Sequence, residues 1–322
     1  YYLIDNGHPH SDSSRRMISF EPNEKFPDGW SELLSMRKPD AIRWIGIWFS
    51  FNGCKTGISP QNEFGPEING HLMPTDDQGT LYPKEDYQSS KVFYDAFIGA
   101  IEQSDFDFVK IDHQASNLAR YVGCRNAIAA ATQNSRAMEE AVRTRMQTMI
   151  NCMALNSVCV FNTRYSAVTR CSRDYGVGNA EKGKYHLHQS YINTLWMGQT
   201  VWPDHDMFHS CDPAAGRMMA VSKAMSGAPI YLSDAPDDFI AAYIRPLCYE
   251  DGRLLRPLAP AAPLPESIFI NPMTDPVAYR VMAPLPGGAM AIVAYHLTEP
   301  TAEGAVRASV RAEDYASASG MI

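Results

Sequence analysis

Short apolar runs that end in polar or acidic residues recur along this chain, and this pattern limits the possible folds more than any other feature of the sequence. Segments of helical character lie between the runs, which is typical of parallel strands covered on both faces. We expect a helix at 134–149 and another at 212–226, the second with Asp212 as its N-cap. The pattern predicts an α/β fold, a (β/α)₈ barrel over residues 1–257. The expected strands are 2–5, 42–48, 107–112, 149–152, 167–170, 200–204 and 229–234.

The two ends of the sequence differ from the central pattern. The chain opens on an apolar run at 1–4 with strand character, and the expected strands are one short of eight, so we expect the barrel to lack its first strand here. Residues 258–263 are rich in Pro and Ala, and 289–295 again resembles a strand. We therefore predict a C-terminal β-sandwich domain, partly present, over 258–322.

Composition excludes several classes of function. A net charge of −8 and a pI near 5.6 argue against a nucleic-acid partner, and no apolar run is long enough to predict a membrane span. The seven cysteines show no CxxC spacing, so we expect neither a zinc site nor a disulfide framework, and reduced thiols favour the cytoplasm. Without a nucleotide-binding glycine loop or a serine nucleophile elbow, the sequence predicts no cofactor and a small-molecule or oligosaccharide partner. The oligomeric state is left open.

Asp112 is the first candidate for chemistry. Cleavage of a glycosidic bond needs a proton donor and a second carboxylate, so paired acids at one rim of a barrel are informative. Asp112 ends an apolar run, and Lys110, two residues earlier, lies on the same side of the strand. The lysine would keep Asp112 ionised, as a nucleophile requires. The alternative is that Asp112 caps the next helix.

Asp174 is the second candidate. It follows Arg170 by four residues, just after a predicted strand, so that Arg170 can bind sugar hydroxyls while Asp174 transfers the proton. An acid must be protonated before it donates, which requires partial burial or a second nearby carboxylate. The alternative is a surface ion pair.

Five segments in order resemble glycoside hydrolase family 36, and within it the branch of raffinose synthases, seed imbibition proteins and alkaline α-galactosidases. The resemblance runs from Tyr2 to about residue 256. It implies a retaining α-galactosidase, with Asp112 as nucleophile and Asp174 as acid/base. The five segments are 151–154, 166–175, 191–198, 203–210 and 226–234.

The same resemblance implies a set of sugar-binding residues. The family's Asp-Asp-Gly-Trp motif corresponds to Asp5, Asn6 and Gly7 followed by His8, and Trp48 corresponds to an aromatic residue at a strand end. Asp204 and Asp206 end another strand on the same rim, where their carboxylates can bind hydroxyls. The residues implied to bind substrate are Asp5, Asn6, Trp48, Lys110, Cys152, Arg170, Asp204 and Asp206.

Three departures from the family pattern leave the activity open. Asn6 replaces an aspartate, Lys55 occupies a loop that usually carries an aromatic residue, and His205 replaces a tryptophan. A metal held by His205 and His209 is one alternative, although hydrogen bonding by these side chains is the simpler interpretation. For the protein as a whole, galactosyl transfer to a sugar acceptor and a carbohydrate-binding barrel without turnover remain alternatives to hydrolysis.

Overall fold

The computed structural model describes residues 1–298 and 305–319, and the chain divides into two compact units, Tyr1–Thr169 and Arg170–Ile322. The boundary falls within β9 (Val168–Arg170). Over the described ranges, no helix is both long and apolar enough to cross a membrane.

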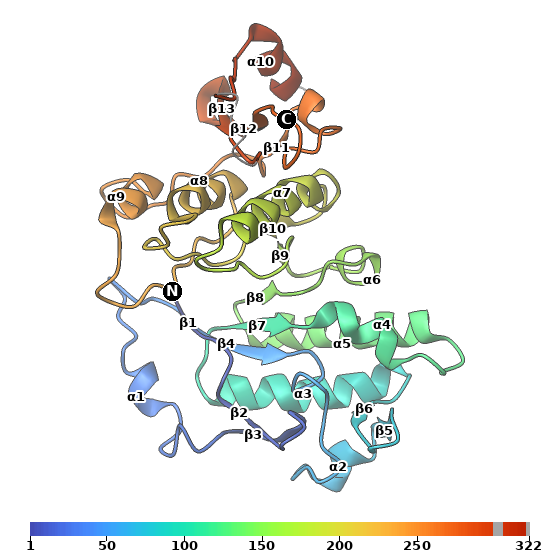
Figure 1. Ribbon diagram of the computed structural model, residues 1–322. Helices are drawn as coiled ribbons and strands as arrows, with labels where there is room; N and C mark the ends of the chain where they lie inside the picture. The colour runs from blue at the N-terminus through green and yellow to red at the C-terminus, as the bar shows by residue number, and fades with distance from the viewer. Residues whose placement is uncertain (299–304, 320–322) are drawn as a thin grey trace. The chain divides into compact units, whose positions relative to one another are not determined.

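The first unit is built on a parallel sheet. Its strands follow the order β1-β4-β7-β8-β9, and each adjacent pair is parallel. In Figure 1, the two long helices α3 and α5 lie together along one side of this sheet. The elements of this unit, besides β9, are β1 (Tyr2–Ile4), β2 (Pro9–Ser11), β3 (Met17–Pro22), α1 (Ser31–Leu34), β4 (Ile45–Ser50), α2 (Pro66–Asn69), β5 (Leu72–Pro74), β6 (Leu81–Pro83), α3 (Tyr87–Gln103), β7 (Phe108–Asp112), α4 (Asn117–Arg120), α5 (Ala127–Arg145), β8 (Thr148–Asn151) and α6 (Ser157–Val160).

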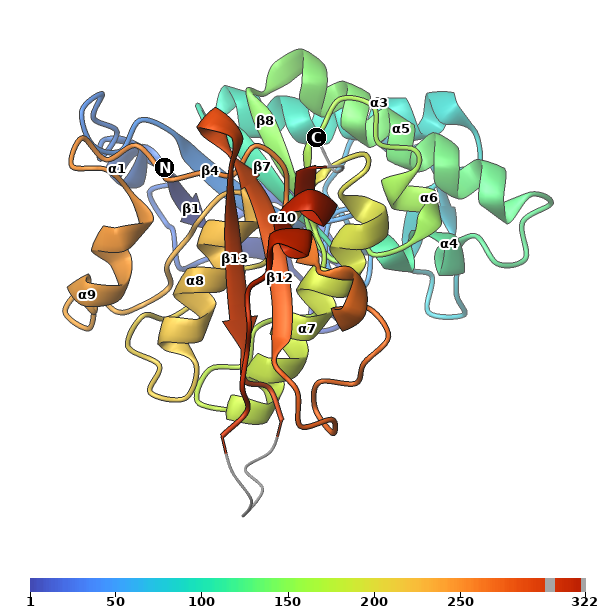
Figure 2. The ribbon, with the colours of Figure 1, turned by 90° about the horizontal axis from the view of Figure 1, so that it is seen from above.

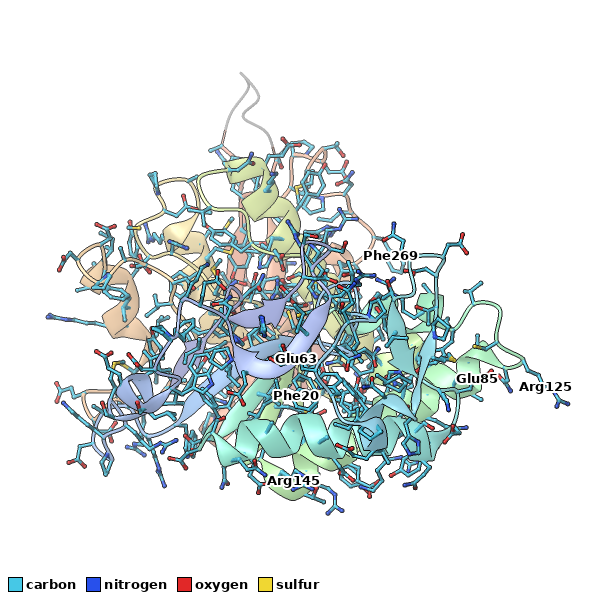
Figure 3. All side chains as sticks on the ribbon, turned by 90° about the horizontal axis from the view of Figure 1, so that it is seen from below. Phe20, Glu63, Glu85, Arg125, Arg145 and Phe269 are labelled. Atoms are coloured by element: carbon cyan, nitrogen blue, oxygen red, sulfur yellow. The ribbon has the colours of Figure 1, made fainter. Side chains whose placement is uncertain are left out.

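Aromatic side chains fill the core between sheet and helices. Phe20 of β3 lies beside α3 (Figure 3), and its ring stacks on Phe64 and Phe97 at centroid distances of 4.4 and 5.4 Å. Gly46 in β4 allows the ring of Phe108 to approach the backbone, because a Cβ at position 46 would come within 2.3 Å of that ring. Every residue of β4 is buried, as expected for a central strand of a parallel sheet.

The second unit combines helices with a small antiparallel sheet. β11, β12 and β13 pair in that order, and Figure 2 shows β12 and β13 side by side with α10 near them. Tyr191 of α7 joins this sheet to the helices, since its hydroxyl lies 2.8 Å from that of Tyr295. The elements are α7 (Ala180–Met197), β10 (Trp202–Asp204), α8 (Gly216–Ser226), α9 (Ala241–Ile244), β11 (Ala262–Pro263), β12 (Tyr279–Leu285), β13 (Ala289–Tyr295) and α10 (Ala312–Ser319).

The predicted α/β class with a parallel sheet is confirmed, and so is β structure after residue 258. The predicted domain boundary at that residue stays a prediction. The strand expected at 229–234 is wrong: this segment makes only an isolated bridge between Leu232 and Phe208. The helix expected at 212–226 begins at Gly216, because the backbone of Ala215 is not helical at φ −146°; Ala215 is therefore the N-cap in place of Asp212, whose carboxylate accepts from the Ala214 amide in the preceding turn.

Candidate active site

In the first unit, Asp112 ends β7 and two donors orient its carboxylate. Trp48 Nε1 donates to Oδ2 at 3.1 Å, and the backbone N–H of His113 donates to Oδ1 at 2.6 Å. Pairing of β4 with β7 sets Trp48 opposite Lys110 and Ser50 opposite Asp112, which brings the indole within reach. Trp48 is buried while Asp112 is only partly so. A carboxylate that is held in place yet open to solvent suits attack on a substrate.

A second polar group lies at the end of the neighbouring strands. Lys110 Nζ donates to Asp5 Oδ2 at 2.8 Å, which links the end of β7 to the residue that follows β1. Lys110 is buried, whereas the Asp5 side chain is 51% exposed. Asn6 is exposed beside it, and the thiol-bearing Cys152 is buried at the end of β8. The first unit thus brings together six of the residues expected from the sequence: Asp5, Asn6, Trp48, Lys110, Asp112 and Cys152.

The backbone is strained just beyond these strand ends. Asn52 after β4, His113 after β7 and Met153 after β8 have φ values of 58°, 57° and 44°. Residues other than glycine rarely adopt this left-handed region, and such strain is concentrated at functional sites. Strain after three neighbouring strands therefore supports a functional site at this end of the sheet.

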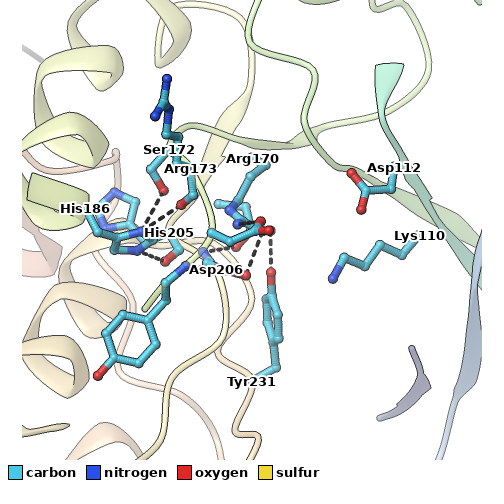
Figure 4. Close-up of polar contacts among 12 residues, drawn as sticks. Lys110, Asp112, Arg170, Ser172, Arg173, His186, His205, Asp206 and Tyr231 are labelled. Carbon is cyan, nitrogen blue, oxygen red and sulfur yellow. Dashed lines mark hydrogen bonds and ion pairs between the residues drawn. The ribbon is translucent and has the colours of Figure 1, made fainter. Parts of the chain in front are cut away.

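In the second unit, Arg170 at the end of β9 holds two carboxylates (Figure 4). Its Nη2 lies 2.7 Å from Asp174 Oδ1, and its Nη1 lies 2.6 Å from Asp206 Oδ1. Arg170 is 1% exposed, but the Asp174 side chain is 79% exposed. The arginine is therefore a fixed support, and it presents the Asp174 carboxylate to solvent.

Asp204 and Asp206 hold the loop that carries Asp174. Asp206 Oδ2 accepts from the backbone N–H of Tyr175 at 2.8 Å, and Asp204 Oδ1 accepts from the N–H of Asp206 at 2.8 Å. Tyr231 donates its hydroxyl to Asp204 Oδ2 at 2.7 Å. Both carboxylates are buried, and Asp206 adopts φ 70°. Much of their hydrogen-bonding capacity is thus used inside the unit, and their predicted contact with sugar hydroxyls stays a prediction.

Burial and charge act against each other in this cluster. Burial raises the pKa of Asp204. Burial alone would also raise the pKa of Asp206, but the Arg170 guanidinium and the Tyr175 N–H more than offset it, so that pKa lies below its usual value. Burial lowers the pKa of Lys223 to about 8. Removal of one partner from such a network leaves a buried charge without compensation and destabilises the fold, so the ionised forms of these groups depend on one another.

Several of these residues were not predicted from the sequence. Tyr231 was assigned to a strand, and neither His186 nor Lys223 was singled out. Lys223 could have been found from the sequence, because it lies on the buried face of α8, one turn after Met219, and a buried lysine needs polar partners. His205 is buried too: its Nδ1 lies 2.9 Å from Ser222 Oγ, and its ring meets the Tyr191 ring edge-on. In this structure it does not form an exposed platform for a sugar.

Three buried histidines predict a loss of stability in mild acid. Burial lowers the pKa of His8 to about 4 and that of His186 to about 3, and the pKa of His205 lies well below its usual value. Each ring is therefore neutral in the folded chain but takes up a proton below pH ~6.5 once unfolded. The stabilisation is present above pH ~6.5 and is lost as the pH falls toward the folded-state values. We expect a decrease of roughly 1–2 kcal/mol per histidine between pH 7 and pH 5.

Urea unfolding at pH 7, 6 and 5 measures this decrease. His8→Gln supplies the control, because the amide can still donate to the Trp48 carbonyl, which lies 2.8 Å from His8 Nε2, but does not titrate. The unfolding free energy of this variant should decrease less between pH 7 and pH 5, by roughly the 1–2 kcal/mol expected for one histidine. An unfolding free energy that stays constant to pH 5 would contradict the account.

Comparison with known sequences identifies the family. The sequence profile described as "Raffinose synthase or seed imbibition protein Sip1" matches residues 78–282, more than half of the chain. The chain belongs to this family. It lies in the raffinose synthase branch of glycoside hydrolase family 36, and the resemblance noted in the sequence is confirmed.

Two curated relatives cover most of the chain, and a third covers less than a third of it. A probable galactinol–sucrose galactosyltransferase 6 of Arabidopsis thaliana is 25% identical over 288 residues, 82% of this chain and 38% of the relative. A galactinol–sucrose galactosyltransferase of Oryza sativa subsp. japonica is 25% identical over 300 residues, 81% of this chain and 37% of the relative. The stachyose synthase of Pisum sativum is 37% identical over 94 residues, 29% of this chain and 11% of the relative. The chain spans less than two fifths of the length of these relatives.

Solved structures with a similar fold include carbohydrate-active enzymes. The α-galactosidase TtGalA from Thermus thermophilus, in complex with stachyose, matches with a TM-score of 0.53 and 16% identity over 77% of this chain and 57% of its own. The family 27 β-L-arabinopyranosidase of Geobacillus stearothermophilus matches with a TM-score of 0.60 and 14% identity over 90% of this chain and 74% of its own. The chain thus shares its fold with these two enzymes.

Proposed function

We propose that this chain is the catalytic (β/α)₈ part of a retaining enzyme that acts on terminal α-galactosyl units of raffinose-like oligosaccharides or glycans. The observation that carries the proposal is the Asp112 carboxylate, which Trp48 and the His113 N–H hold at a strand end. Enzymes of barrel folds place their chemistry at this end of the strands. Paired carboxylates suffice for glycosidic cleavage, so the proposed reaction uses no cofactor.

The proposed reaction has two steps. Asp112 attacks the anomeric carbon while the bond to the leaving oxygen breaks, and Asp174 gives that oxygen its proton. Asp174 then takes a proton from the acceptor, whose oxygen attacks the anomeric carbon and releases Asp112. The mechanism requires the two carboxyl groups to lie about 5 Å apart around the bound sugar. Bound sugar also excludes water from the exposed Asp174.

The ionic groups beside the two carboxylates suit recognition of a polyhydroxylated substrate. The exposed Asp5 carboxylate, held by Lys110, offers free acceptor sites for sugar hydroxyls. Arg170 fixes the position of Asp174 through a charge-assisted hydrogen bond. Binding and proton transfer therefore depend on separate ion pairs.

Water is the proposed acceptor, and a sugar is the second candidate. The second is favoured by the relatives whose names are galactinol–sucrose galactosyltransferase. Both reactions proceed through the same galactosyl-enzyme, so they differ only in the group that enters last.

Product analysis with and without sucrose separates the two acceptors. With nitrophenyl α-galactoside, hydrolysis releases galactose and nitrophenol in equal amounts whether or not sucrose is present. Transfer gives less galactose than nitrophenol when sucrose is present, and a new trisaccharide makes up the difference. Binding of the galactoside without release of nitrophenol would show a carbohydrate-binding barrel and overturn the proposed function.

A further inference from the structure

We propose that His186 is a positioning residue for Asp174; this inference rests on the proposed function. His186 lies on α7 and is buried. Figure 4 shows its ring beside Ser172 and Arg173, two residues of the loop that bears Asp174. The loop at 171–175 is thus in contact with a side chain from a helix that starts after it.

One edge of the imidazole holds the loop directly. His186 Nδ1 lies 2.8 Å from the carbonyl oxygen of Arg173 and 3.2 Å from Ser172 Oγ. Its ring also meets the ring of Tyr175 edge-on at 5.7 Å. His186 therefore contacts the loop on both sides of position 174. Nδ1 and Nε2 of this ring each face a carbonyl oxygen, that of Arg173 at 2.8 Å and that of His205 at 2.9 Å, so the imidazole spans the space between the loop and the end of β10.

The opposite edge of the imidazole is anchored in the core. Lys223 Nζ lies 3.3 Å from His186 Nε2, and it also donates to the carbonyl of His205. His205 Nδ1 in turn contacts Ser222, so α8 and the end of β10 are joined at this point. His186 thereby ties the exposed loop to two buried elements, α8 and the end of β10.

This arrangement affects proton transfer more than binding. Arg170 and Asp206 fix the start of the loop and the Tyr175 amide, but neither holds the Arg173 carbonyl. Without the imidazole, the Arg173 carbonyl loses this partner, and the residue next to Asp174 keeps the weaker 3.5 Å contact between its N–H and Gln189 Oε1. An acid that is displaced by about 1 Å loses on the order of 10²-fold in rate. The loss falls on substrates whose leaving group needs a proton.

Two substitutions at position 186 test the inference, one that keeps the bond to the loop and one that removes the bonds of both ring edges. Asn at 186 places an amide donor near the Nδ1 position and preserves the bond to Arg173, whereas Phe fills the space without either bond. His188 on the same helix, which packs edge-on against Tyr279, gives the matched control His188→Phe. We expect His186→Phe to lower kcat/KM for raffinose on the order of 10²-fold and that for nitrophenyl α-galactoside less than about 5-fold. His186→Asn should recover most of the loss, and His188→Phe should change neither rate by more than about 3-fold.

Hydrogen exchange separates this inference from the proposed function. Peptides that cover 171–178 should exchange faster in His186→Phe than in wild type or His188→Phe, whether or not the protein turns over galactosides. Unchanged exchange, or an equal loss of kcat/KM on both substrates, would overturn the positioning role. A wild type without activity on any α-galactoside would instead refute the proposed function, and the exchange result would still decide whether His186 holds the loop.

Discussion

Asp112→Ala is expected to lower kcat for nitrophenyl α-galactoside by at least about 10⁴-fold, because the reaction loses the group that forms the covalent intermediate. The fold should persist, since Asp112 is only partly buried and its strand is held by the pairing of β7 with β4 and β8. Circular dichroism and thermal unfolding check this point, and a stopped assay of nitrophenol release measures the rate.

Azide makes the result specific for a nucleophile. The anion fits the space that the missing carboxylate leaves, attacks the anomeric carbon from the same side and expels nitrophenol, which gives β-galactosyl azide. We expect partial recovery of nitrophenol release with this product. Asp105→Ala is the control, because this aspartate makes an ion pair with Arg37 before β7 and is 78% exposed; surface pairs contribute at most about 1 kcal/mol. Full activity of Asp112→Ala would refute the assignment.

Asp174→Ala is expected to lower kcat/KM for raffinose by about 10²- to 10⁴-fold but that for nitrophenyl α-galactoside much less. Nitrophenolate leaves without a proton, whereas the sugar alkoxide does not. In the second step both substrates need a base, so azide should also accelerate the variant with the activated substrate. The measurements are kcat/KM on both substrates and kcat for nitrophenyl α-galactoside with and without azide.

The neighbouring residue supplies the control for Asp174. Arg173 is exposed, and its contact with His186 is made by its backbone carbonyl, so Arg173→Ala keeps the loop in place. Its rates on both substrates should stay close to wild type. An equal loss of activity on both substrates in Asp174→Ala would contradict a role in proton donation.

The sequence predicted the strands of the parallel sheet because each is a short apolar run that ends in a polar residue. β7 and β9 lie at the expected positions, because a short apolar run is typical of a strand that is buried on both faces of a parallel sheet. The segment 229–234 has the same composition but fails as a strand. Its ladder hydrogen bonds are confined to Phe208, and side chains hold the rest of its course, since Tyr231 donates to Asp204 and the segment at 210–211 bonds with Asp234.

The site was predictable where local spacing decides the contact. Arg170 and Asp174 lie four residues apart and form an ion pair whose carboxylate is exposed, which was the alternative that their spacing left open. Asp112 lies at the end of its strand, as alternation and the following polar residue indicated. Contacts between distant elements escaped prediction: the indole of Trp48 reaches Asp112 across a strand pair, and His186 reaches the Arg173 carbonyl from a helix. Such contacts depend on the register and on the packing of helices, which no local pattern encodes.

The buried cluster shows a second limit of sequence reasoning. Asp206 follows a strand, so its position predicted contact with substrate, yet its carboxylate is used by Arg170 and the Tyr175 amide. A strand-end carboxylate has the same sequence pattern whether it meets a ligand or supports a neighbour. Only the partners in the folded chain distinguish the two roles.

Covalent labelling tests the central claim most directly. A ring-fluorinated α-galactosyl substrate with a good leaving group forms the glycosyl-enzyme but releases it slowly, so the intact protein gains the mass of one fluorogalactosyl group. After digestion, we predict that this mass lies on the peptide that contains Asp112 and that Asp112→Ala takes up none. Label on a different carboxylate, or turnover of natural substrate with inversion at the anomeric carbon, would contradict the mechanism.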